Sequence, residues 1–570
     1  MHPDFSGVQA WIAAVGGAVS LSDLRGLGRS ADGCLVDPRD DSVTVFPVPE
    51  AGGPDYPRFQ LRPTDLAYDT TMAPMGCVPG DFDEDGTTDL LVTYWGRSPI
   101  VFMNQGSGVA GPTADGFHAH ELVDPPQIWN TTTANVGDVD GDGHLDILLG
   151  NFFPDGARVL DPTATDDGRM AMNSSLGKAL NGGGAKLFLT KPTGGVQDMP
   201  EIIDATSALP TSSTSAWTLA TGMQDLTGDL LPEVYLANDF GPDQLLVNDS
   251  TPGRAGFTAV YGSRDPYTPR SQVLGHDSFK GMGVTFTYAD GGGLPSIMVG
   301  NITTEFGLHE SNLFFVPSGE PEDLAAGRVP YRERSEALGI ARAGWSWDVK
   351  AGDFDNSGVD EILQSTGFLK GVDNAWPELQ ELAMGNDQLV LDPDFWPTLG
   401  PDADLAGHQP NPFWVRDGEG RYADLASAVE IDEPWNSRGI ALGDVDGDGR
   451  LDALVANQFE DSVLLLNQGP VNRPAAYLQL VSRGAAGGDR PAIGAQVELE
   501  LPGGGKAQLY PANGHSGVSA SDVHLALPPG PPVAARVSWR DATGLHSREV
   551  MLEPGRHQLV LDEDQSAEAP

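Results

Sequence analysis

The chain has 570 residues, of which 33 are Lys or Arg and 81 are Asp or Glu, so its formal net charge is -48 at pH 7. A surface this acidic repels nucleic-acid phosphates and anionic lipids, and we expect neither as a partner. No apolar stretch reaches the length needed to cross a bilayer, so we also expect no membrane insertion. The 72 Gly and 11 Trp, spread among short strand-like runs and turns, predict a folded, loop-rich protein rather than a disordered one.

An acidic loop followed at once by an apolar run occurs in three full copies. The pattern Gly-Asp-x-Asp-x-Asp-Gly-x-x-Asp starts its acidic part at Asp81, Asp138 and Asp444. Carboxylates at loop positions 1, 3, 5 and 9 can surround one hard cation, and Gly at position 6 makes a turn that a side chain would block. Position 12 is Val or Leu inside a predicted strand, which excludes the Glu-containing EF-hand. A lone loop of this kind is often only a solvated turn, but three copies predict repeated calcium sites.

A fourth copy starts at Asp353, with Ser357 at position 5 and Glu361 at position 9, and we expect it to bind calcium as well. The sequence therefore predicts three to five Ca²⁺ ions. The predicted ligands are Asp81, Asp83, Asp85, Asp89, Asp138, Asp140, Asp142, Asp146, Asp353, Asp355, Ser357, Glu361, Asp444, Asp446, Asp448 and Asp452.

Weaker copies complete a series of repeats. The loop at Asp225 has Leu230 in place of the Gly, which argues against an ion there, and the loops near residues 23 and 288 keep little more than Asp23 and Asp290. Loop starts near residues 23, 81, 138, 225, 288, 353 and 444 define seven units. Units with several short strands are typical of four-stranded propeller blades, and a closed ring leaves no long sheet edge exposed. We predict an all-β fold with a seven-bladed β-propeller over residues 1–471.

Two longer spacings between repeats predict insertions near residues 155–200 and 371–430. Within the second insertion, DNAWPELQELAMG predicts a short helix with Asn374 near its N-terminal cap. Cys34 and Cys77 lie in or beside predicted strands of adjacent blades. A disulfide between them is one alternative, but sequence cannot supply its geometry, and we favour two buried thiols.

Residues 472–562 form a second predicted unit. Val497, Leu499 and Leu501 alternate with polar residues, which predicts a small antiparallel β domain that packs on the propeller and completes its closure. Residues 563–570 predict a disordered acidic tail.

The repeats resemble the FG-GAP/VCBS family, whose calcium-loop blades also form the integrin α-subunit propeller. The segments AIGAQVELEL, PANGHSGVSASDVHLAL and VAARVSWRDATG resemble the ASPIC/UnbV domain of the cartilage acidic protein group. This chain departs from that domain at Gln496, where Arg is usual, and at Gly514-His515-Ser516, where the family has Gly-Tyr-Leu-Ser. The resemblance implies a secreted or periplasmic protein. The sequence shows no clear signal peptide, because Asp4 precedes the apolar residues 11–19, so either a leader was removed or the protein works inside the cell.

The resemblance also implies where a working face lies. In such propellers the calcium loops gather on one face, and the starts of the first strands meet the ends of the second strands on the opposite face. Aromatic residues at these strand ends predict a ligand pocket near the axis. The alternative is that large aromatic residues at equivalent positions of the repeats only seal the propeller or pack between its blades. The predicted ligand-binding residues are Trp95, Trp129, Trp217, Trp345, Trp347 and Trp435, and the predicted charged groups are Asp239, Lys280, Glu305 and Arg438.

Two functional hypotheses remain open. The first is a calcium-stabilised propeller that binds a protein, glycan or small ligand on the face opposite the calcium loops, with an unknown oligomeric state. The second is a non-redox cyclase, isomerase or lyase of natural-product biosynthesis, in which the charged groups supply acid–base catalysis and the tryptophans stabilise a cation. The sequence shows no zinc or iron spacing, no nucleophile elbow and no phosphate loop, which favours binding over catalysis.

Overall fold

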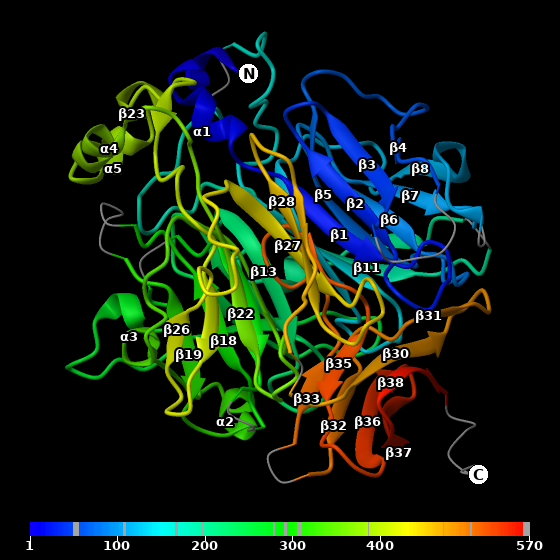
Figure 1. The fold of residues 1–570 in the computed structure, drawn as a ribbon. Helices are drawn as coiled ribbons and strands as arrows, with labels where there is room; N and C mark the ends of the chain where they lie inside the picture. Colours follow the sequence, from blue (N-terminus) through cyan, green and yellow to red (C-terminus); the bar gives the residue numbers. More distant parts are fainter. Residues whose placement is uncertain are drawn as a thin grey trace.

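The computed structural model describes residues 1–49, 56–106, 110–165, 169–195, 198–277, 280–289, 293–304, 310–385, 387–470, 472–501 and 504–562. The predicted all-β fold is confirmed, because the regular structure consists mainly of small β-sheets with only a few short helices (Figure 1). The predicted acidic tail, Asp290 and Glu305 lie outside the described residues. Among the described residues, no helix has the length and apolarity needed to cross a membrane.

Seven antiparallel sheets follow one another through the described part of the chain before residue 466, and each runs outward from a first, inner strand. The first two sheets contain β1 (Ala18–Ser22), β2 (Asp32–Asp37), β3 (Ser42–Pro47) and β4 (Phe59–Gln60), then β5 (Ala73–Gly80), β6 (Asp89–Trp95), β7 (Ile100–Asn104) and β8 (Phe117–Glu121). The next two contain β9 (Thr131–Gly137), β10 (Asp146–Asn151), β11 (Gly184–Lys191) and β12 (Glu201–Asp204), then β13 (Thr218–Gln224), β14 (Glu233–Asn238), β15 (Gln244–Asn248) and β16 (Phe257–Val260). The last three contain β17 (Gly283–Thr287), β18 (Ser296–Gly300), β19 (Leu313–Pro317) and β20 (Tyr331–Glu333), then β21 (Ser346–Gly352), β22 (Glu361–Thr366), β25 (Phe413–Arg416) and β26 (Tyr422–Asp424), then β27 (Ser437–Gly443), β28 (Asp452–Asn457) and β29 (Val463–Leu465).

The sheets stack face to face, so their second strands are buried on both sides. In β6, Leu90 and Val92 pack in a cluster with residues of the first sheet, whereas Leu91 packs with Ile147 of the third sheet. Successive side chains of a strand point to opposite faces, so an uninterrupted apolar run fits a strand between two neighbours. This burial explains why each acidic loop leads directly into a run of apolar residues.

The inner strands of successive sheets lie beside one another. β1 contacts β5, β5 contacts β9, and the series continues through β13, β17 and β21 to β27, which contacts β1 again. This order supports the seven-bladed ring, which stays a prediction from the repeats.

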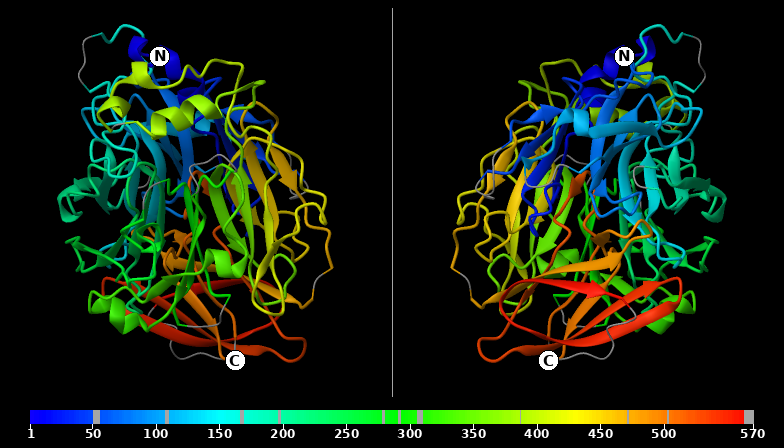
Figure 2. Two further views of the ribbon diagram at one scale, coloured as in Figure 1. Left: turned by 90° about the vertical axis from the view of Figure 1, so that its left-hand side faces the viewer. Right: turned by 90° about the vertical axis from the view of Figure 1, so that its right-hand side faces the viewer.

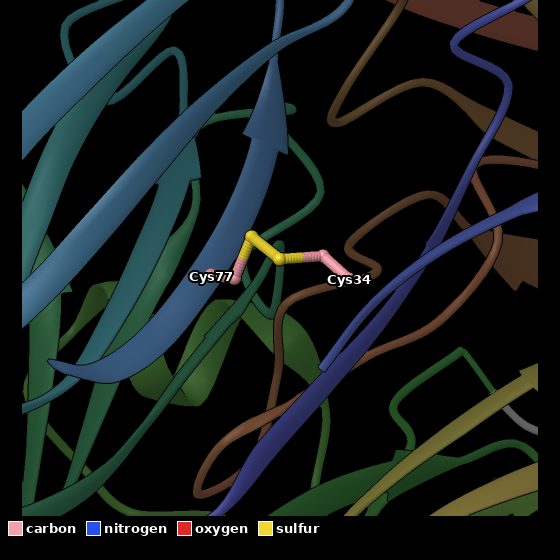
Figure 3. The surroundings of a disulfide bond; sticks show 2 residues. All are labelled: Cys34 and Cys77. Atoms are coloured by element: carbon pink, nitrogen blue, oxygen red, sulfur yellow. A yellow bond between two sulfur atoms is a disulfide. The ribbon is translucent and has the colours of Figure 1, made fainter. Parts of the chain in front are cut away.

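A disulfide links the first two sheets, so the favoured prediction of two free thiols is wrong. Cys34 in β2 and Cys77 in β5 are both buried, and their Cα atoms are 6.4 Å apart (Figure 3). That distance lies within the range that a disulfide can bridge. Stacking of two sheets brings the cysteines together, and the sequence separation of 43 residues gives no sign of it.

The N-terminal residues and the second insertion lie together at one end of the molecule (Figures 1 and 2). A 3₁₀ helix over Pro3–Val8 leads into α1 (Gln9–Ala13), and the insertion contains α4 (Trp376–Ala383), α5 (Asp387–Val390) and the parallel pair β23 (Asp373–Asn374) and β24 (Ala403–Asp404). The predicted helix is confirmed, because α4 starts where Asn374 accepts the backbone N–H of Trp376 at 3.1 Å. The other two α-helices of the described residues are α2 (Pro321–Ala325) and α3 (Ser335–Leu338).

The C-terminal strands lie at the opposite end of the molecule (Figures 1 and 2). Their apolar side chains form a cluster of their own, which includes Leu480, Val497 and Val537. One sheet contains β30 (Ala475–Arg483), β31 (Asp489–Pro491), β35 (Val523–Ala526) and β38 (Gly555–Leu561), and the other contains β32 (Gln496–Leu499), β33 (Lys506–Gln508), β36 (Val533–Asp541) and β37 (Gly544–Leu552). The remaining strand, β34 (Gly517–Val518), leaves this unit and pairs in parallel with β1.

Candidate metal centres and ligand cavity

Each full acidic loop joins an inner strand to the second strand of its sheet and has the same local structure. The position 1 carboxylate turns back onto the loop: Asp81 accepts the N–H groups of Asp85 at 3.1 Å and Gly86 at 2.9 Å. Gly at position 6 has a φ of 91° at Gly86 and 90° at Gly143, in the left-handed region that favours glycine. These bonds hold the loop closed, so that the other carboxylates face its centre.

Four groups of carboxylates are brought together in the described residues, one in each predicted calcium loop. In each group the carboxylate oxygens that face one another lie within 4.8 Å. The groups are Asp81, Asp83 and Asp85; Asp138, Asp140 and Asp146; Asp353, Asp355 and Glu361; and Asp444, Asp446 and Asp452. The other predicted ligands, Asp89, Asp142, Ser357 and Asp448, belong to the same loops, and each accepts a backbone N–H.

The electrostatics of these groups fit a bound cation. Burial, together with the neighbouring carboxylates, raises the pKa of Asp81 to about 7 and the pKa of Asp138 to about 7. The pKa of Glu361 is raised to about 8 by burial and by Asp355. Clustered carboxylates in a buried place are unfavourable as anions unless a positive charge compensates them. A hard divalent cation with oxygen ligands supplies that charge.

Two of the weaker loops, those at Asp225 and Asp23, keep the turn but not the carboxylate group. In the loop at Asp225, Leu230 takes the place of the glycine with a φ of 59°, and its N–H still bonds Asp225 at 3.1 Å. Thr227 stands where the other loops have a second carboxylate. Asp23 accepts the N–H groups of Leu27 and Gly28, both at 2.7 Å, and so holds an ordinary turn.

At the end of the molecule opposite the acidic loops, four of the predicted tryptophans belong to one apolar cluster. Trp95, Trp217, Trp345 and Trp347 are all at least 94 % buried there, because the N-terminal residues and both insertions pack over them. The prediction did not include Trp11, Trp376 and Trp396, which belong to the same cluster. The insertion sequence carries no repeat signal that would have placed them.

Two predicted tryptophans lie elsewhere, which corrects the ring proposed from the repeats. Trp129 packs against Phe188 between the second and third sheets, with the Lys186 ammonium 5.0 Å from its ring centroid. Trp435 is only half-buried and is not part of the aromatic cluster. Trp217 and Trp345 also directly precede inner strands, so an equivalent position along the chain does not by itself place a tryptophan in the cluster.

A cavity of about 60 Å³ lies inside the aromatic cluster. Its lining combines Trp345 with Asp239 and Lys280, so the structure brings three of the predicted residues to one place. The indole N–H of Trp345 is buried and has no hydrogen-bond partner among the described residues. The rest of the lining is mainly apolar and includes Trp11, Leu176, Phe240, Ile302, Phe368, Trp376, Leu379, Leu382, Trp396 and Leu399.

Asp239 and Lys280 are both buried, and each is pushed toward its neutral form. Burial raises the pKa of Asp239 to about 7, although the nearby Lys280 lowers it. Burial lowers the pKa of Lys280 to about 8, while the charges of Glu310 and Asp239 raise it. The backbone connects them too, since the Lys280 N–H donates to the Asp239 carbonyl at 2.5 Å. Buried ionisable groups with pKa values shifted toward neutral pH are frequent at functional sites.

Arg438, a predicted catalytic residue, bonds backbone carbonyls and is not among the residues that line the cavity. It is fully buried, and its guanidinium donates to the Ala14 carbonyl at 2.9 and 3.0 Å and to the Gly367 carbonyl at 2.8 Å. It also lies 4.2 Å from the Trp347 ring centroid. These contacts leave it outside the cavity and anchor the N-terminal residues to the inner strand β27.

Residues 510–518 of the C-terminal unit, here called the axial loop, lie among the inner strands. Asn513 bonds Asn135 of β9 and Met223 of β13, and Gly514 pairs with Thr221 of β13. On another side, the Asp348 carboxylate of β21 accepts the N–H groups of His515 at 3.0 Å and Gly517 at 3.1 Å. Sequence reasoning missed this loop, although it coincides with the Gly514-His515-Ser516 departure from the family pattern.

Two family models match parts of the chain. A model described as FG-GAP-like repeat matches residues 81–149, and one described as ASPIC and UnbV matches residues 485–568. The chain therefore contains an FG-GAP-like repeat and a C-terminal ASPIC and UnbV segment, and the predicted resemblance to both is confirmed. No curated protein matches the chain.

Solved structures share only a distant likeness. The rhamnogalacturonan lyase YesW is 12 % identical over 78 % of this chain and 82 % of its own, with a TM-score of 0.28. The exotype rhamnogalacturonan lyase YesX is 12 % identical over 95 % and 84 %, with a TM-score of 0.29. The Bacillus licheniformis rhamnogalacturonan lyase PL11 is 11 % identical over 77 % and 81 %, with a TM-score of 0.27. Scores this low carry no argument about function.

Proposed function

We propose that this protein is a calcium-binding seven-bladed β-propeller that holds a small, largely apolar ligand with one hydrogen-bond acceptor. The observation that carries the proposal is the cavity in which Trp345, Asp239 and Lys280 meet within an aromatic wall. Ligand sites are typically apolar cavities with a few polar groups that fix orientation.

Calcium is supported by the repeated donor set. The four groups of three carboxylates, each within 4.8 Å, offer hard oxygen ligands, which Ca²⁺ and other hard cations prefer. Asp81, Asp138, Asp353 and Asp444 would each hold an ion together with the carboxylates that follow in the same loop. The ion would then compensate the mutual repulsion of the group and stabilise the folded state.

The cavity lining favours a small apolar ligand over a protein or a glycan. A glycan needs many polar partners, whereas the described part of the lining offers few polar groups besides Asp239, Lys280 and the unpaired N–H of Trp345. A volume of about 60 Å³ is below the several hundred Å³ of most ligand pockets, so a ligand with two fused rings must displace one wall. The wall formed by Leu379 and Leu382 belongs to the short helix α4, which lies at the surface and exposes 82 % of the adjoining Met384.

The disulfide supports a location of the protein in an oxidising compartment. Disulfides persist mainly outside the cell or in the periplasm. The Cys34–Cys77 bond therefore agrees with the secreted or periplasmic location implied by the family resemblance.

Catalysis is a second candidate, favoured by the environment of Asp239. With a pKa of about 7, this carboxyl group is partly protonated at neutral pH and faces the aromatic cavity. It could add its proton to a carbon–carbon double bond of the ligand, while the tryptophan rings stabilise the resulting carbocation. Loss of a neighbouring proton back to the Asp239 carboxylate would give an isomer and restore the enzyme.

Binding can be tested with 2-naphthol and naphthalene as probes, followed by isothermal titration and tryptophan fluorescence. We expect 2-naphthol to bind more tightly than naphthalene, because its oxygen can accept the Trp345 N–H. Trp345→Phe keeps a ring to pack on Phe368, whose ring centroid is 4.2 Å away, but removes that N–H, so it should abolish the difference between the probes.

A cavity-filling pair provides the control. Leu379→Trp places a large ring in the cavity wall and should weaken 2-naphthol binding at least tenfold, whereas Glu378→Trp adds the same ring on the exposed side of α4 and should not. Equal binding to the wild type and Leu379→Trp would exclude the cavity as the site. Asp239→Asn should retain probe binding and would remove an isomerase activity.

A further inference from the structure

The C-terminal unit contacts the acidic loops themselves, not only the strands beside them. At the loop of Asp81, the Ala485 N–H donates to the Glu84 carboxylate at 2.6 Å, and Arg490 lies 3.4 Å from the same carboxylate. Arg490 also donates to the Gly143 carbonyl of the next loop. Arg490 therefore holds two adjacent loops together. A bond of 2.8 Å between His144 of the second loop and Glu84 of the first also links them.

The contacts continue around the same end of the molecule. Asn472 donates through its backbone N–H to the Asp355 carbonyl at 2.8 Å and through its side chain to the Asp355 carboxylate at 2.7 Å. Arg556 donates to the Asp444 carbonyl at 2.8 Å and to its carboxylate at 3.0 Å. All four loops with a carboxylate group therefore touch the C-terminal unit.

These bonds require one particular shape of each loop. Asp355 and Asp444 are predicted ion ligands, and the other two acceptors, the Glu84 carboxylate and the Gly143 carbonyl, belong to the same loops, so a loop that opens moves these acceptors away. Without a cation, three carboxylates within 4.8 Å repel one another, which favours an opened loop. A bound cation favours the closed loop that the C-terminal unit contacts.

We propose that cation binding and docking of the C-terminal unit are thermodynamically linked, with Arg490 and Asn472 as positioning residues for the metal loops. The inference rests on the proposed calcium function. Occupied loops hold the C-terminal unit in place, and the docked unit in turn holds the loops in their ion-binding shape. Linkage of this kind is reciprocal, so each partner raises the affinity for the other by the same factor.

The axial loop connects this docking to the interior. Residues 510–518 leave the C-terminal unit between β33 and β35 and contact inner strands of several sheets, including β9 through Asn513 and β21 through Asp348. Undocking of the C-terminal unit therefore withdraws the axial loop or strains its bonds. Cation occupancy of the acidic loops therefore controls how stably the axial loop stays bound among the inner strands.

Charge and linkage predict opposite results for one substitution, and this makes the test sharp. Arg490→Met removes a positive charge beside two metal loops, so electrostatics alone predicts tighter calcium binding. Linkage predicts weaker binding, by about fivefold or more, because the docked shape is lost. Arg536→Met is the matched control, since it makes the same change on β36, where Arg536 is half-exposed and pairs with Glu500. Calorimetric titration of the full chain with calcium measures both.

Hydrogen exchange supplies a second measurement on the same proteins. We expect amide exchange in residues 510–518 to rise at least tenfold in excess EGTA, and also in Arg490→Met with calcium present. The outer strands β15 and β19 should stay protected in Arg490→Met, which separates undocking from global unfolding. Tighter or unchanged calcium binding in Arg490→Met, or unchanged exchange of the axial loop, would overturn the linkage. If the wild type binds no calcium at all, the proposed function fails first, and the linkage fails with it.

Discussion

Asp348→Ala should destabilise the centre of the molecule strongly. The Asp348 side chain is fully buried and accepts four backbone N–H groups, those of Val349, Ile440 and His515 at 3.0 Å and that of Gly517 at 3.1 Å. It also lies 4.0 Å from the Lys350 ammonium, which is itself buried. The carboxylate therefore joins β21, β27 and the axial loop.

The magnitude follows from what the substitution leaves behind. Removing one partner of a buried ion pair costs about 3 to 5 kcal/mol, and each N–H left without an acceptor costs about 1 to 3 kcal/mol more when water cannot replace it. We therefore expect the free energy of unfolding to fall by about 4 kcal/mol or more. The double substitution Asp348→Ala with Lys350→Met should be less harmful than Asp348→Ala alone, because no unpaired buried charge remains.

Urea unfolding in saturating calcium, followed by tryptophan fluorescence, measures the effect. Trp347 is a suitable reporter because its ring centroid lies 5.3 Å from that of His515 in the axial loop. Asp265→Ala is the control, since Asp265 also accepts backbone N–H groups but on an exposed turn, and it should leave the midpoint unchanged. A midpoint for Asp348→Ala close to that of the wild type would refute the role assigned to this carboxylate.

Three further predictions concern the cations, the disulfide and pH. Excess EGTA should lower the Tm, because a cation present at a hundredfold excess over its Kd adds about 2.7 kcal/mol per site to the free energy of unfolding. Asp140→Asn should lower the Tm only when calcium is present. Identical melting curves with and without EGTA would show that calcium does not stabilise the fold. Replacing Cys34 and Cys77 by Ser should cost about 4 kcal/mol for a closed loop of 43 residues, measured by urea unfolding against the reduced wild type, which should behave like the variant. Burial lowers the pKa of His515 to about 4 from 6.5. As the pH falls, the unfolded chain therefore binds a proton at this residue before the folded chain does. The free energy of unfolding should be unaffected by this residue above pH 6.5 and should fall by about 3 kcal/mol as the pH drops to 4. His515→Asn should lose that part of the pH dependence, and an unchanged slope would show that another group causes it.

The sequence by itself determined the acidic loops and the strands that follow them. The carboxylates of the loop at Asp81 and its glycine lie within nine residues, so short-range hydrogen bonds and one left-handed residue decide their shape. The repeat of this loop located the strands, since β6, β10 and β28 each begin at the last acidic residue of a full copy, and β22 begins at Glu361 of the fourth copy. Local chemistry repeated along the chain is readable without tertiary structure.

The aromatic cavity could be predicted only in part. Equivalent positions in the repeats placed Trp217 and Trp345 near one another, and the structure brings Asp239 and Lys280 to the same cavity. The walls made by Trp11 and Trp396 come from segments outside the repeats. Apolar contact has no directional code in sequence, so docking of such segments cannot be read from their spacing.

Only the tertiary structure decided the long-range partners. The Cys34–Cys77 bond depends on how two sheets stack, and the burial of Arg438 depends on an N-terminal carbonyl at Ala14. The axial loop reaches Asp348 across 167 residues of sequence, through bonds to backbone groups that every residue possesses. Such contacts form when folded sheets present complementary donors and acceptors in three dimensions, and no single segment of the chain contains that information.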